Sequence, residues 1–438
     1  MSTSRSRTAS PTGREVDVLV ISVPPLWPAD RGYRVHGARV AAALRRLGYR
    51  VGIACMEPGD DPPPAELAAM LHPWPEAGAD ALMQLQRGWA GPLAPLRRKL
   101  ASYRGVEPAR LAGLVPLVER LAPRVVLGTG QLGGVLLQAL RRLREQDMAK
   151  LWYAADEVAY FHLSCMTREG PADWAGRLQH AAIHAALERG FGSGLDGVIG
   201  VHPRDTALLR LATGARAETI RNGVDLDYFA PDPDAAVEPQ TLIFWGRLDF
   251  EPNVDAARWL ANDLVPALRK PFPGATLRLV GRQPCDAVLA LGDRPGVEVV
   301  GPVDDLRPMA RSTAAVVLPM RCGGGIKNKL LEAAGMGLPI VASSKAVGGL
   351  SWDDGETPLA VADGLEATRD AVGRAWRDAA WAASLRASAR RWVERRHTWE
   401  ASARGVIALA EAVRGGAIEP THAGSRHAPS PAAPAATA

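Results

Sequence analysis

The stretch from Ala314 to Ala342 reads AAVVLPMRCGGGIKNKLLEAAGMGLPIVA, and it decides the fold of this chain. It begins with a short apolar run, passes through three consecutive glycines into a helical pattern, and ends in a second apolar run. Two buried strands joined by a helix are the repeating unit of a parallel sheet. The stretch therefore predicts strands at 314–318 and 339–342, with a helix at 328–336 between them.

The same alternation of strand and helix extends in both directions from this unit. We expect further strands at 16–22, 50–55, 125–127, 150–154, 197–201, 218–220, 241–245, 275–280 and 297–300. We expect helices at 35–47, 134–145, 176–191, 253–268 and 305–312, and helical stretches over 364–396 and 398–413. This order of elements predicts an α/β protein with parallel sheets.

Two domains of similar size account for the alternation, because a turn-rich segment from Pro231 to Pro239 interrupts it. The predicted fold is two doubly wound, Rossmann-like domains that face an interdomain cleft, with ligands at the carboxyl ends of the strands. Whether the C-terminal helix crosses back to the first domain is open. We expect a disordered tail at 1–14, a first domain at 15–230, a linker at 231–240, a second domain at 241–397, a C-terminal helix at 398–414 and a disordered tail at 415–438.

The composition fits a globular protein of 438 residues and excludes several other classes. Hydrophobic residues make up 47% of the chain and charged residues 23%, so disorder as the main state is excluded. The net charge is +5, but only six of the 52 basic residues are lysines, a bias that predicts no nucleic-acid partner. The widely spaced cysteines exclude a disulfide scaffold and a zinc module, and fit a reducing cytoplasm: Cys55, Cys165, Cys285 and Cys322.

No segment of the sequence predicts export or a membrane span. Residues 1–14 lack the apolar core of a signal peptide, and no apolar stretch is long enough to span a bilayer. We therefore expect a cytoplasmic protein. Peripheral contact with the inner face of the membrane stays open, because apolar and basic residues interleave over 89–100, which suits either an anionic membrane or a solvated helix face.

The glycine loop of the opening stretch carries the strongest chemical signal. Its amides at the start of a helix, together with Lys327 and Lys329, suit a diphosphate. Glu332, about one turn along the helix, suits the hydroxyls of an attached ribose. The alternative is a solvated loop with surface lysines.

Several segments resemble the donor-binding half of the family 4 glycosyltransferases, and the resemblance runs from about Val16 to Val413. Near the N-terminus, Pro24-Pro-Leu-Trp-Pro-Ala-Asp-Arg-Gly32 resembles more loosely the glycine loop after the family's first strand. The segments of the donor-binding half are Arg221-Asn-Gly-Val-Asp-Leu-Asp-Tyr-Phe-Ala-Pro231, Phe244-Trp-Gly-Arg-Leu-Asp-Phe-Glu-Pro-Asn253, Gly323–Glu332 and Ala333-Ala-Gly-Met-Gly-Leu-Pro-Ile-Val-Ala342.

The resemblance implies a GT-B fold and transfer of a sugar from a nucleotide-diphosphate sugar, with a UDP-sugar favoured. The acceptor would be a hydroxyl of a glycan, a lipid-linked molecule or a small secondary metabolite, and the anomeric configuration would be retained. Arg247 and Lys329 would bind the diphosphate and act in catalysis, Lys327 would assist, and Glu332 would bind the ribose.

The resemblance also implies two backbone contacts with the donor. The backbone around Asp30–Gly32 would close on the phosphates from the first domain, and Gly324 and Gly325 would approach the donor from the second. Neither a metal ion nor another cofactor is implied.

Two departures from the family pattern motivate a second hypothesis. The first of two family glutamates, which contacts the donor sugar, would fall at Gly324. A lysine that often follows the Gly-Arg pair is absent from 251–253, which places more of the phosphate charge on Lys327 and Lys329. Some members carry a similar Ile-Lys-Asn-Lys loop, so activity is not excluded. The second hypothesis is a catalytically weakened GT-B protein that acts as the partner of another transferase.

A third hypothesis rests on Gly128-Thr-Gly-Gln-Leu-Gly133, which matches the GxGxxG fingerprint of dinucleotide-binding proteins. It would make the chain an NAD(P)-dependent oxidoreductase; the alternative is an ordinary glycine-rich turn. Asp156, some twenty residues further on, follows a predicted strand. Its carboxylate would either orient an acceptor hydroxyl, as a catalytic residue, or cap a helix.

The sequence predicts no metal site. Two DxD matches begin at Asp225 and Asp232, but one lies in the Asn-Gly-Val-Asp segment and the other in the linker. His180 and His184 share a helix face, yet no third ligand is expected within reach. His162 is a candidate contact for the acceptor or a structural histidine.

Overall fold

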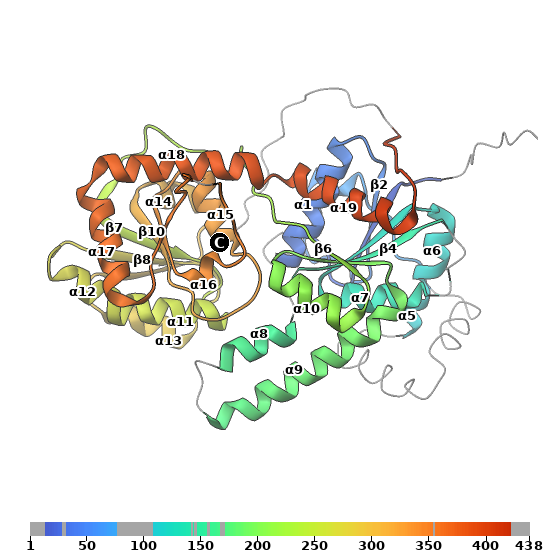
Figure 1. Ribbon diagram of the computed structural model, residues 1–438, viewed down its shortest axis with the longest axis horizontal. Helices are drawn as coiled ribbons and strands as arrows, with labels where there is room; N and C mark the ends of the chain where they lie inside the picture. Colours follow the sequence, from blue (N-terminus) through green and yellow to red (C-terminus); the bar gives the residue numbers. More distant parts are fainter. Residues whose placement is uncertain are drawn as a thin grey trace, which may run out of the picture.

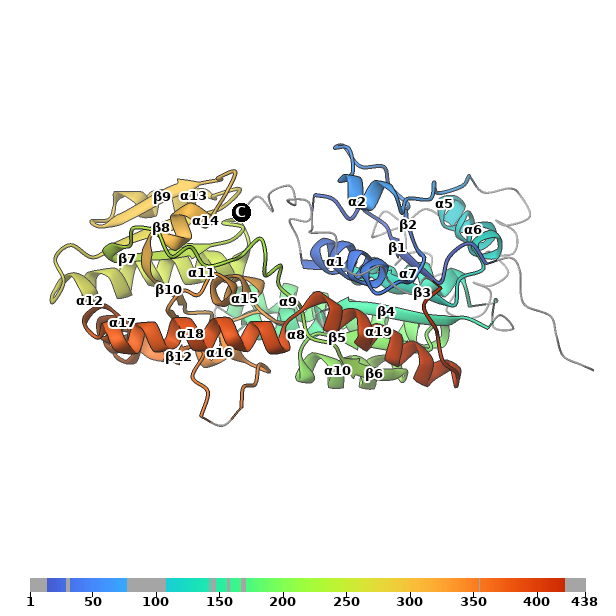
Figure 2. The same cartoon turned by 90° about the horizontal axis from the view of Figure 1, so that it is seen from above.

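The computed structural model describes residues 14–28, 32–76, 108–141, 143, 147–155, 158–166, 171–353 and 355–421. These residues form two lobes, each built around its own parallel sheet (Figures 1 and 2). The prediction of two doubly wound α/β domains is confirmed.

The first sheet has the strand order β2-β1-β3-β4-β5-β6, and all neighbouring strands among the described residues pair in parallel. The central strands are mostly apolar and buried because helices cover both faces of the sheet, whereas the edge strand β6 is polar and partly exposed. Their bounds are β1 Val18–Ser22, β2 Val51–Cys55, β3 Val125–Thr129, β4 Ala149–Ala155, β5 Gly197–Gly200 and β6 Arg216–Thr219.

The second sheet has the order β12-β11-β10-β7-β8-β9, again with parallel pairing throughout the described strands. The first strand of this lobe, β7, therefore lies beside its fourth, β10. The strand that follows β7 in the chain, β8, lies on one side of this pair, and the strand that follows β10, β11, lies on the other. Ligands of doubly wound sheets bind at such a switch point. The bounds are β7 Glu238–Trp245, β8 Thr276–Val280, β9 Val297–Gly301, β10 Thr313–Leu318, β11 Ile340–Ala342 and β12 Ala360–Val361.

Helices connect the strands in both lobes. Those of the first lobe are α1 Gly32–Arg46, α2 Ala65–Ala68, α5 Pro108–Ala112, α6 Leu114–Leu121, α7 Gly130–Ala139, α8 Val158–Cys165, α9 Pro171–Phe191 and α10 Pro203–Thr213, with a 3-10 turn at Gly192–Gly194. Those that follow are α11 Glu251–Trp259, α12 Val265–Arg269, α13 Asp286–Leu289, α14 Arg307–Arg311, α15 Asn328–Gly335, α16 Ser344–Val347, α17 Gly364–Arg377, α18 Ala379–Arg396 and α19 Trp399–Arg414, with a 3-10 turn at Ala290–Asp293.

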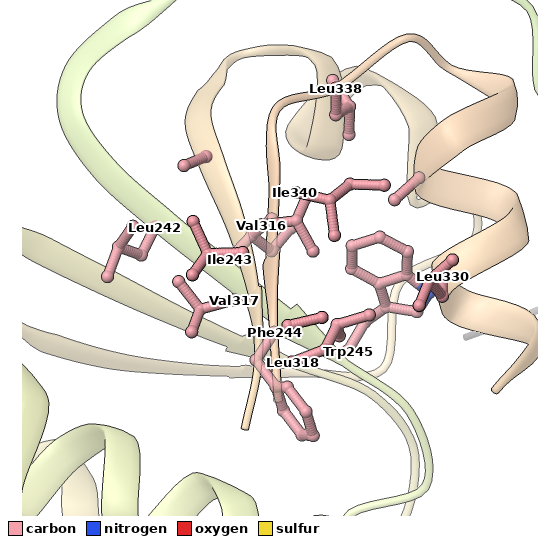
Figure 3. Packing of buried hydrophobic residues seen from close by; sticks show 14 of the residues in the cluster. Leu242, Ile243, Phe244, Trp245, Val316, Val317, Leu318, Leu330, Leu338 and Ile340 are labelled. Atoms are coloured by element: carbon pink, nitrogen blue, oxygen red, sulfur yellow. The ribbon is translucent and has the colours of Figure 1, made fainter. Parts of the chain in front are cut away.

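The core of the second lobe forms where β7 and β10 pack against α15. Figure 3 shows the apolar side chains of these strands, with Trp245 directed toward Leu330 of the helix. Both residues are at most 3% exposed. Because the helix is anchored in this way, the loop between β10 and α15 has two fixed ends.

The chain passes between the lobes at two neighbouring places. Val224 N donates to His397 O (2.9 Å), and the ring Nδ1 of His397 lies 2.9 Å from Asn222 O. Beyond His397, helix α19 lies on the first lobe (Figure 1), where Trp399 and Ala403 belong to the core that covers one face of the first sheet.

The predicted helices at 134–145 and 253–268 differ from the observed ones. Helix α7 begins at Gly130 rather than 134, because Gly128 and Gly133 let the helix start directly against its strand: a Cβ on Gly133 would lie 2.5 Å from the Gly128 carbonyl carbon. The predicted helix at 253–268 is interrupted by a π-helical turn, Leu260–Leu264. Pro266, two residues after the end of that turn, has no N–H for the α-helical ladder.

The strand β7 begins at Glu238, inside the stretch expected to be the linker. Glu238 N donates to Ser312 O (2.7 Å), so the backbone joins the sheet before the turn-rich composition ends. The helical stretch at 364–396 is divided at Asp378, whose carboxylate caps α18 by accepting from Trp381 N (2.9 Å).

Among the described residues, no helix is long and apolar enough to cross a membrane.

Candidate functional site

The candidate site lies where the loops after β7 and β10 meet, at the switch point of the second sheet. Gly246 and Gly281 follow β7 and β8 with φ values of 140° and 149°. A Cβ on Gly281 would lie 1.8 Å from Gly246 O, and a Cβ on Gly246 would lie 2.8 Å from Lys329 Nζ. Glycine is therefore required at both positions, and the backbone here approaches a lysine ammonium.

Lys329 lies in the first turn of α15, and its ammonium is held at the carboxyl end of β7. It donates to Asn253 Oδ1 (2.7 Å) and lies 4.2 Å from the centre of the Phe244 ring. Burial, and to a smaller extent the charge of Lys327, lowers the pKa of Lys329 from 10.5 to about 7. An ammonium with such a pKa is strongly stabilised by an incoming anion, so Lys329 has the electrostatics of an anion-binding group.

Glu332 lies one turn further along α15. Its Oε2 accepts a hydrogen bond from Trp245 Nε1 (2.8 Å), which fixes the carboxylate at the end of β7. Burial raises the pKa of Glu332, while the Trp245 hydrogen bond and the Lys329 charge oppose the rise. The structure thus brings the two predicted donor-binding residues of α15 together against consecutive residues of one strand.

Arg247 follows Gly246 and is paired within its own loop. Its Nε and Nη2 donate to the two carboxylate oxygens of Asp249 (2.8 and 3.2 Å). Both side chains are about a third exposed, at 36%. Because the ion pair is partly exposed to solvent, a diphosphate would replace Asp249 as the partner of Arg247 at modest energetic cost.

The amides of the glycine loop are bound by side chains from the other lobe. Gly325 N donates to Asp205 Oδ2 (2.9 Å), and Gly323 N donates to Ser164 Oγ (3.0 Å). Asp205 lies in α10 and is only 1% exposed, whereas Ser164 lies in α8. A Cβ on Gly324 would stand 3.5 Å from Asp205 Oδ2. A carboxylate from the first lobe therefore closes on the loop at the position where the family pattern has its own glutamate.

Sequence reasoning missed three of these residues. Asn253 was detectable as a polar residue six positions after Arg247, at the end of the motif segment, and it also donates to Arg247 O (2.8 Å). Asp205 and Ser164 show no signal in the sequence, because their partners lie in the opposite half of the chain. Lys327 donates to the carbonyl of Gly324 within the loop.

Helices α8 and α9 lie between the two lobes (Figures 1 and 2) and make further contacts with the second lobe. One of them is a parallel ring stack of 5.7 Å between centroids with an interplanar angle of 12°. The contacting pairs are Phe161 with Phe250, Arg177 with Glu251 and the thiol of Cys165 with the thiol of Cys322. The loops around the candidate site are therefore held from the first lobe on two sides.

Other predicted site residues lie elsewhere. Gly32 is the exposed first residue of α1, with nothing within 4 Å of a Cβ built on it. Asp156 and the amphipathic stretch 89–100 lie outside the described residues. Asp225 of the first DxD match forms an ion pair with Arg39 (2.9 Å), and Asp232 of the second accepts from Asp234 N (3.1 Å).

The GxGxxG match serves close packing between β3 and α7. A Cβ on Gly128 would lie 2.7 Å from Gly133 O. The carbonyl of Gly130 accepts from Trp152 Nε1 (2.7 Å), and Trp152 is 1% exposed. The contacts within the lobe thus account for these glycines.

The expectation that His180 and His184 have no third ligand within reach is wrong. His162 of α8 lies beside them, and the possible ligand atoms of the three residues are all within 4.8 Å of one another. The error arose because the sequence shows the spacing within α9 but does not show that α8 packs on it.

A hollow of about 430 Å³ lies away from this site. Its walls come from the linker, from the end of α15 and from α18, and they include Arg311, Arg386 and Arg390. No residue at the carboxyl end of a strand lines it, so it is not the candidate donor site.

Comparisons with known proteins concern the fold and one segment of the chain. Residues 239–378 match the family described as Glycosyl transferases group 1. No curated protein matches the chain. Sucrose-phosphate synthase from Thermosynechococcus elongatus has a similar structure, with a TM-score of 0.66, 20% sequence identity, and coverage of 91% of this chain and 99% of that one.

Two further solved structures extend the likeness. Anabaena HepE in complex with UDP and glucose has a TM-score of 0.59 at 15% identity, and covers 91% of this chain and 100% of its own. WaaG, a glycosyltransferase involved in lipopolysaccharide biosynthesis, has a TM-score of 0.58 at 16% identity, with the same coverage. At these identities the likeness establishes the fold.

The fold is of the GT-B type, and the matched segment has the sequence pattern of the group 1 glycosyl transferases. The matched segment covers most of the second lobe, which carries the cluster around Lys329 and Glu332.

Proposed function

We propose that this protein is a retaining glycosyltransferase that moves a sugar from a nucleotide-diphosphate sugar to an acceptor hydroxyl. The observation that carries the proposal is the Lys329 ammonium, held by Asn253 and Phe244 against Gly246 at the switch point. A UDP-sugar is the favoured donor, since the similar HepE has been solved with UDP and with UDP-glucose. The acceptor class is a glycan, a lipid-linked molecule or a secondary metabolite.

In this proposal the second lobe binds the donor. Lys329 and Arg247, assisted by Lys327, stabilise the negative charge that develops on the departing diphosphate. The Glu332 carboxylate accepts hydrogen bonds from the ribose hydroxyls, and its bond from Trp245 keeps it oriented. None of these roles requires a metal ion.

The acceptor would bind from the first lobe, within residues 15–230, and the second domain would span 241–397. Gly32 and Asp156 belong to this acceptor side of the proposal, with Gly32 closing on the phosphates and Asp156 orienting the hydroxyl. A cytoplasmic location with peripheral membrane contact through residues 89–100 would suit a lipid-linked acceptor.

The test is a thermal-shift screen with UDP, GDP, TDP, ADP and NAD. A nucleotide at 100 times its Kd adds about 2.7 kcal/mol to the free energy of unfolding. We expect UDP to stabilise the protein, and Lys329→Ala and Glu332→Ala to abolish the shift. Lys270→Ala is the matched control, because Lys270 is an exposed lysine at the far end of α12.

Each alternative predicts a different outcome. Stabilisation by NAD alone would favour the oxidoreductase hypothesis. Binding of UDP without turnover of any UDP-sugar, including slow hydrolysis, would favour a weakened transferase that serves a partner. Unchanged donor affinity and transfer in both site variants would refute the assignment of the site.

A further inference from the structure

Three histidines from two helices meet beside the contacts between the lobes. His162 comes from α8, and His180 and His184 come from one face of α9. The ring of His162 lies 5.1 Å from that of His180 and 5.4 Å from that of His184, with interplanar angles of 18° and 15°. Their possible ligand atoms lie within 4.8 Å of one another.

This donor set suits a particular class of ion. Neutral imidazole is a ligand of Zn²⁺, Ni²⁺, Cu²⁺ and Co²⁺, and three protein ligands with one open position form a common zinc site. Zinc–nitrogen bonds of about 2.1 Å place tetrahedral ligand atoms about 3.4 Å apart, so the rings need to draw together by up to about 1.5 Å. Rotation of the exposed His180 side chain supplies such a movement.

A neighbouring side chain holds His184 in place, and His180 is open to solvent. His184 is 4% exposed, and its Nδ1 lies 2.7 Å from the side-chain amide of Gln131. With the amide turned so that its oxygen accepts from Nδ1–H, Nε2 keeps its lone pair for a metal ion. A hydrogen bond of this kind orients many metal-binding histidines. The exposed His180 provides access from solvent.

The Arg177 guanidinium lies near the cluster, and its positive charge is already paired with a carboxylate. Arg177 Nη1 lies 3.4 Å from His162 Nδ1, at the long limit of a hydrogen bond. The same guanidinium forms an ion pair with Glu251 of the second lobe. Its charge is therefore balanced from the other side, and the weak contact with His162 is one that a metal ion would displace.

We propose that His162, His180 and His184 form a binding site for one divalent transition-metal ion of the Zn²⁺ class. The ion ties α8 to α9. Because α8 carries Ser164, which binds the Gly323 amide, the ion also holds the helix that contacts the glycine loop. The site is separate from the proposed donor site and does not depend on the proposed function.

The test uses the full chain without an affinity tag, freed of metal with a chelator. Titration calorimetry with Zn²⁺ measures affinity and stoichiometry, and Co²⁺ is followed by its visible absorption bands. We expect one ion per chain, and a loss of affinity of at least about tenfold in His162→Ala and His180→Ala. His72→Ala is the matched control, because His72 lies beside β2, where its N donates to Ile53 O (2.8 Å), on a different part of the first lobe.

The His162 variant is decisive, since two histidines one turn apart on a helix can chelate an ion by themselves. If His162→Ala binds Zn²⁺ as tightly as the wild type, the ion sits on α9 alone and the proposal is overturned. The exposed His180 can be replaced without disturbing the core, so its variant also remains informative. Absence of Zn²⁺ binding to the wild type at 100 µM would equally overturn the proposal.

Discussion

If Lys329 contacts the diphosphate as proposed, we expect the affinity for a nucleoside diphosphate to depend on pH, and the surroundings of Lys329 determine the sign. In the free protein, burial lowers the pKa of Lys329 from 10.5 to about 7. A bound diphosphate raises that pKa again, because an opposite charge in contact favours the ammonium form. Between these pKa values the complex retains a proton that the free protein has released. Binding of UDP must therefore weaken as the pH rises.

The size of the effect follows from proton linkage. With a pKa of about 7 in the free protein and about 10 in the complex, the Kd for UDP rises about 5-fold from pH 7 to pH 8 and about 45-fold from pH 7 to pH 9. At pH 8, binding takes up about 0.9 proton. The pKa of a terminal phosphate is about 6, so its own titration is nearly complete at pH 7.

The free energy of unfolding of the free protein responds with the opposite trend. From pH 7 to about 10.5 the unfolded chain binds more protons at Lys329 than the folded protein does. The contribution of this group to stability therefore rises with pH over that window.

Titration calorimetry at pH 7, 8 and 9 measures the Kd, and two buffers of different ionisation enthalpy give the proton uptake. Lys329→Arg keeps a charge at every pH and should bind UDP with little pH dependence. Lys329→Met should bind UDP weakly at every pH, and Lys270→Ala should behave as the wild type does.

Equal UDP affinity at pH 7 and pH 9, without proton uptake, would refute the reasoning about the Lys329 pKa. If Lys329→Met also bound UDP as tightly as the wild type, Lys329 would not contact the diphosphate at all. The two results separate an error in the electrostatics from an error in the placement of the donor.

Three further predictions concern the contacts that hold the loops. Asp205→Ala leaves the Gly325 amide without its acceptor and should lower the free energy of unfolding by about 1–3 kcal/mol in chemical denaturation, with recovery in Asp205→Asn. Diamide, which accepts two electrons and two protons, should join Cys165 and Cys322 in a disulfide detectable by peptide mass spectrometry. Gly281→Ala forces a Cβ to 1.8 Å from a backbone oxygen, and should cost at least about 3 kcal/mol or prevent folding.

Each of these has a control within the chain. Gly176→Ala, in the middle of α9 with nothing within 4 Å of its Cβ, should raise stability by up to about 1 kcal/mol. A loss in that variant as large as in Gly281→Ala would contradict the steric argument. Cys165→Ser should prevent the disulfide, and a cross-link that persists there would show that a different cysteine reacts. Unchanged stability of Asp205→Ala would mean that the loop amide finds another acceptor.

Patterns of short range predicted much of the fold. The apolar runs of β1, β7 and β10 are buried on both faces, so each forms a nearly continuous hydrophobic stretch that is recognisable without its neighbours. The two-residue strand β12 and helix α8 were missed. The first is too short for any periodicity, and the second, VAYFHLSC, is mostly apolar and its few polar residues do not form an amphipathic pattern.

The sequence by itself predicted the parallel architecture and the position of Lys329 and Glu332 on the helix after the glycine loop, because a glycine loop that opens a helix is a local feature. Tertiary structure alone decided the strand order that brings the end of β7 to that loop, and the burial that lowers the pKa of Lys329. It also decided the partners that come from the other lobe, Asp205 and Ser164. The physical reason is that desolvation and contacts between distant segments depend on packing, which no spacing along the chain records.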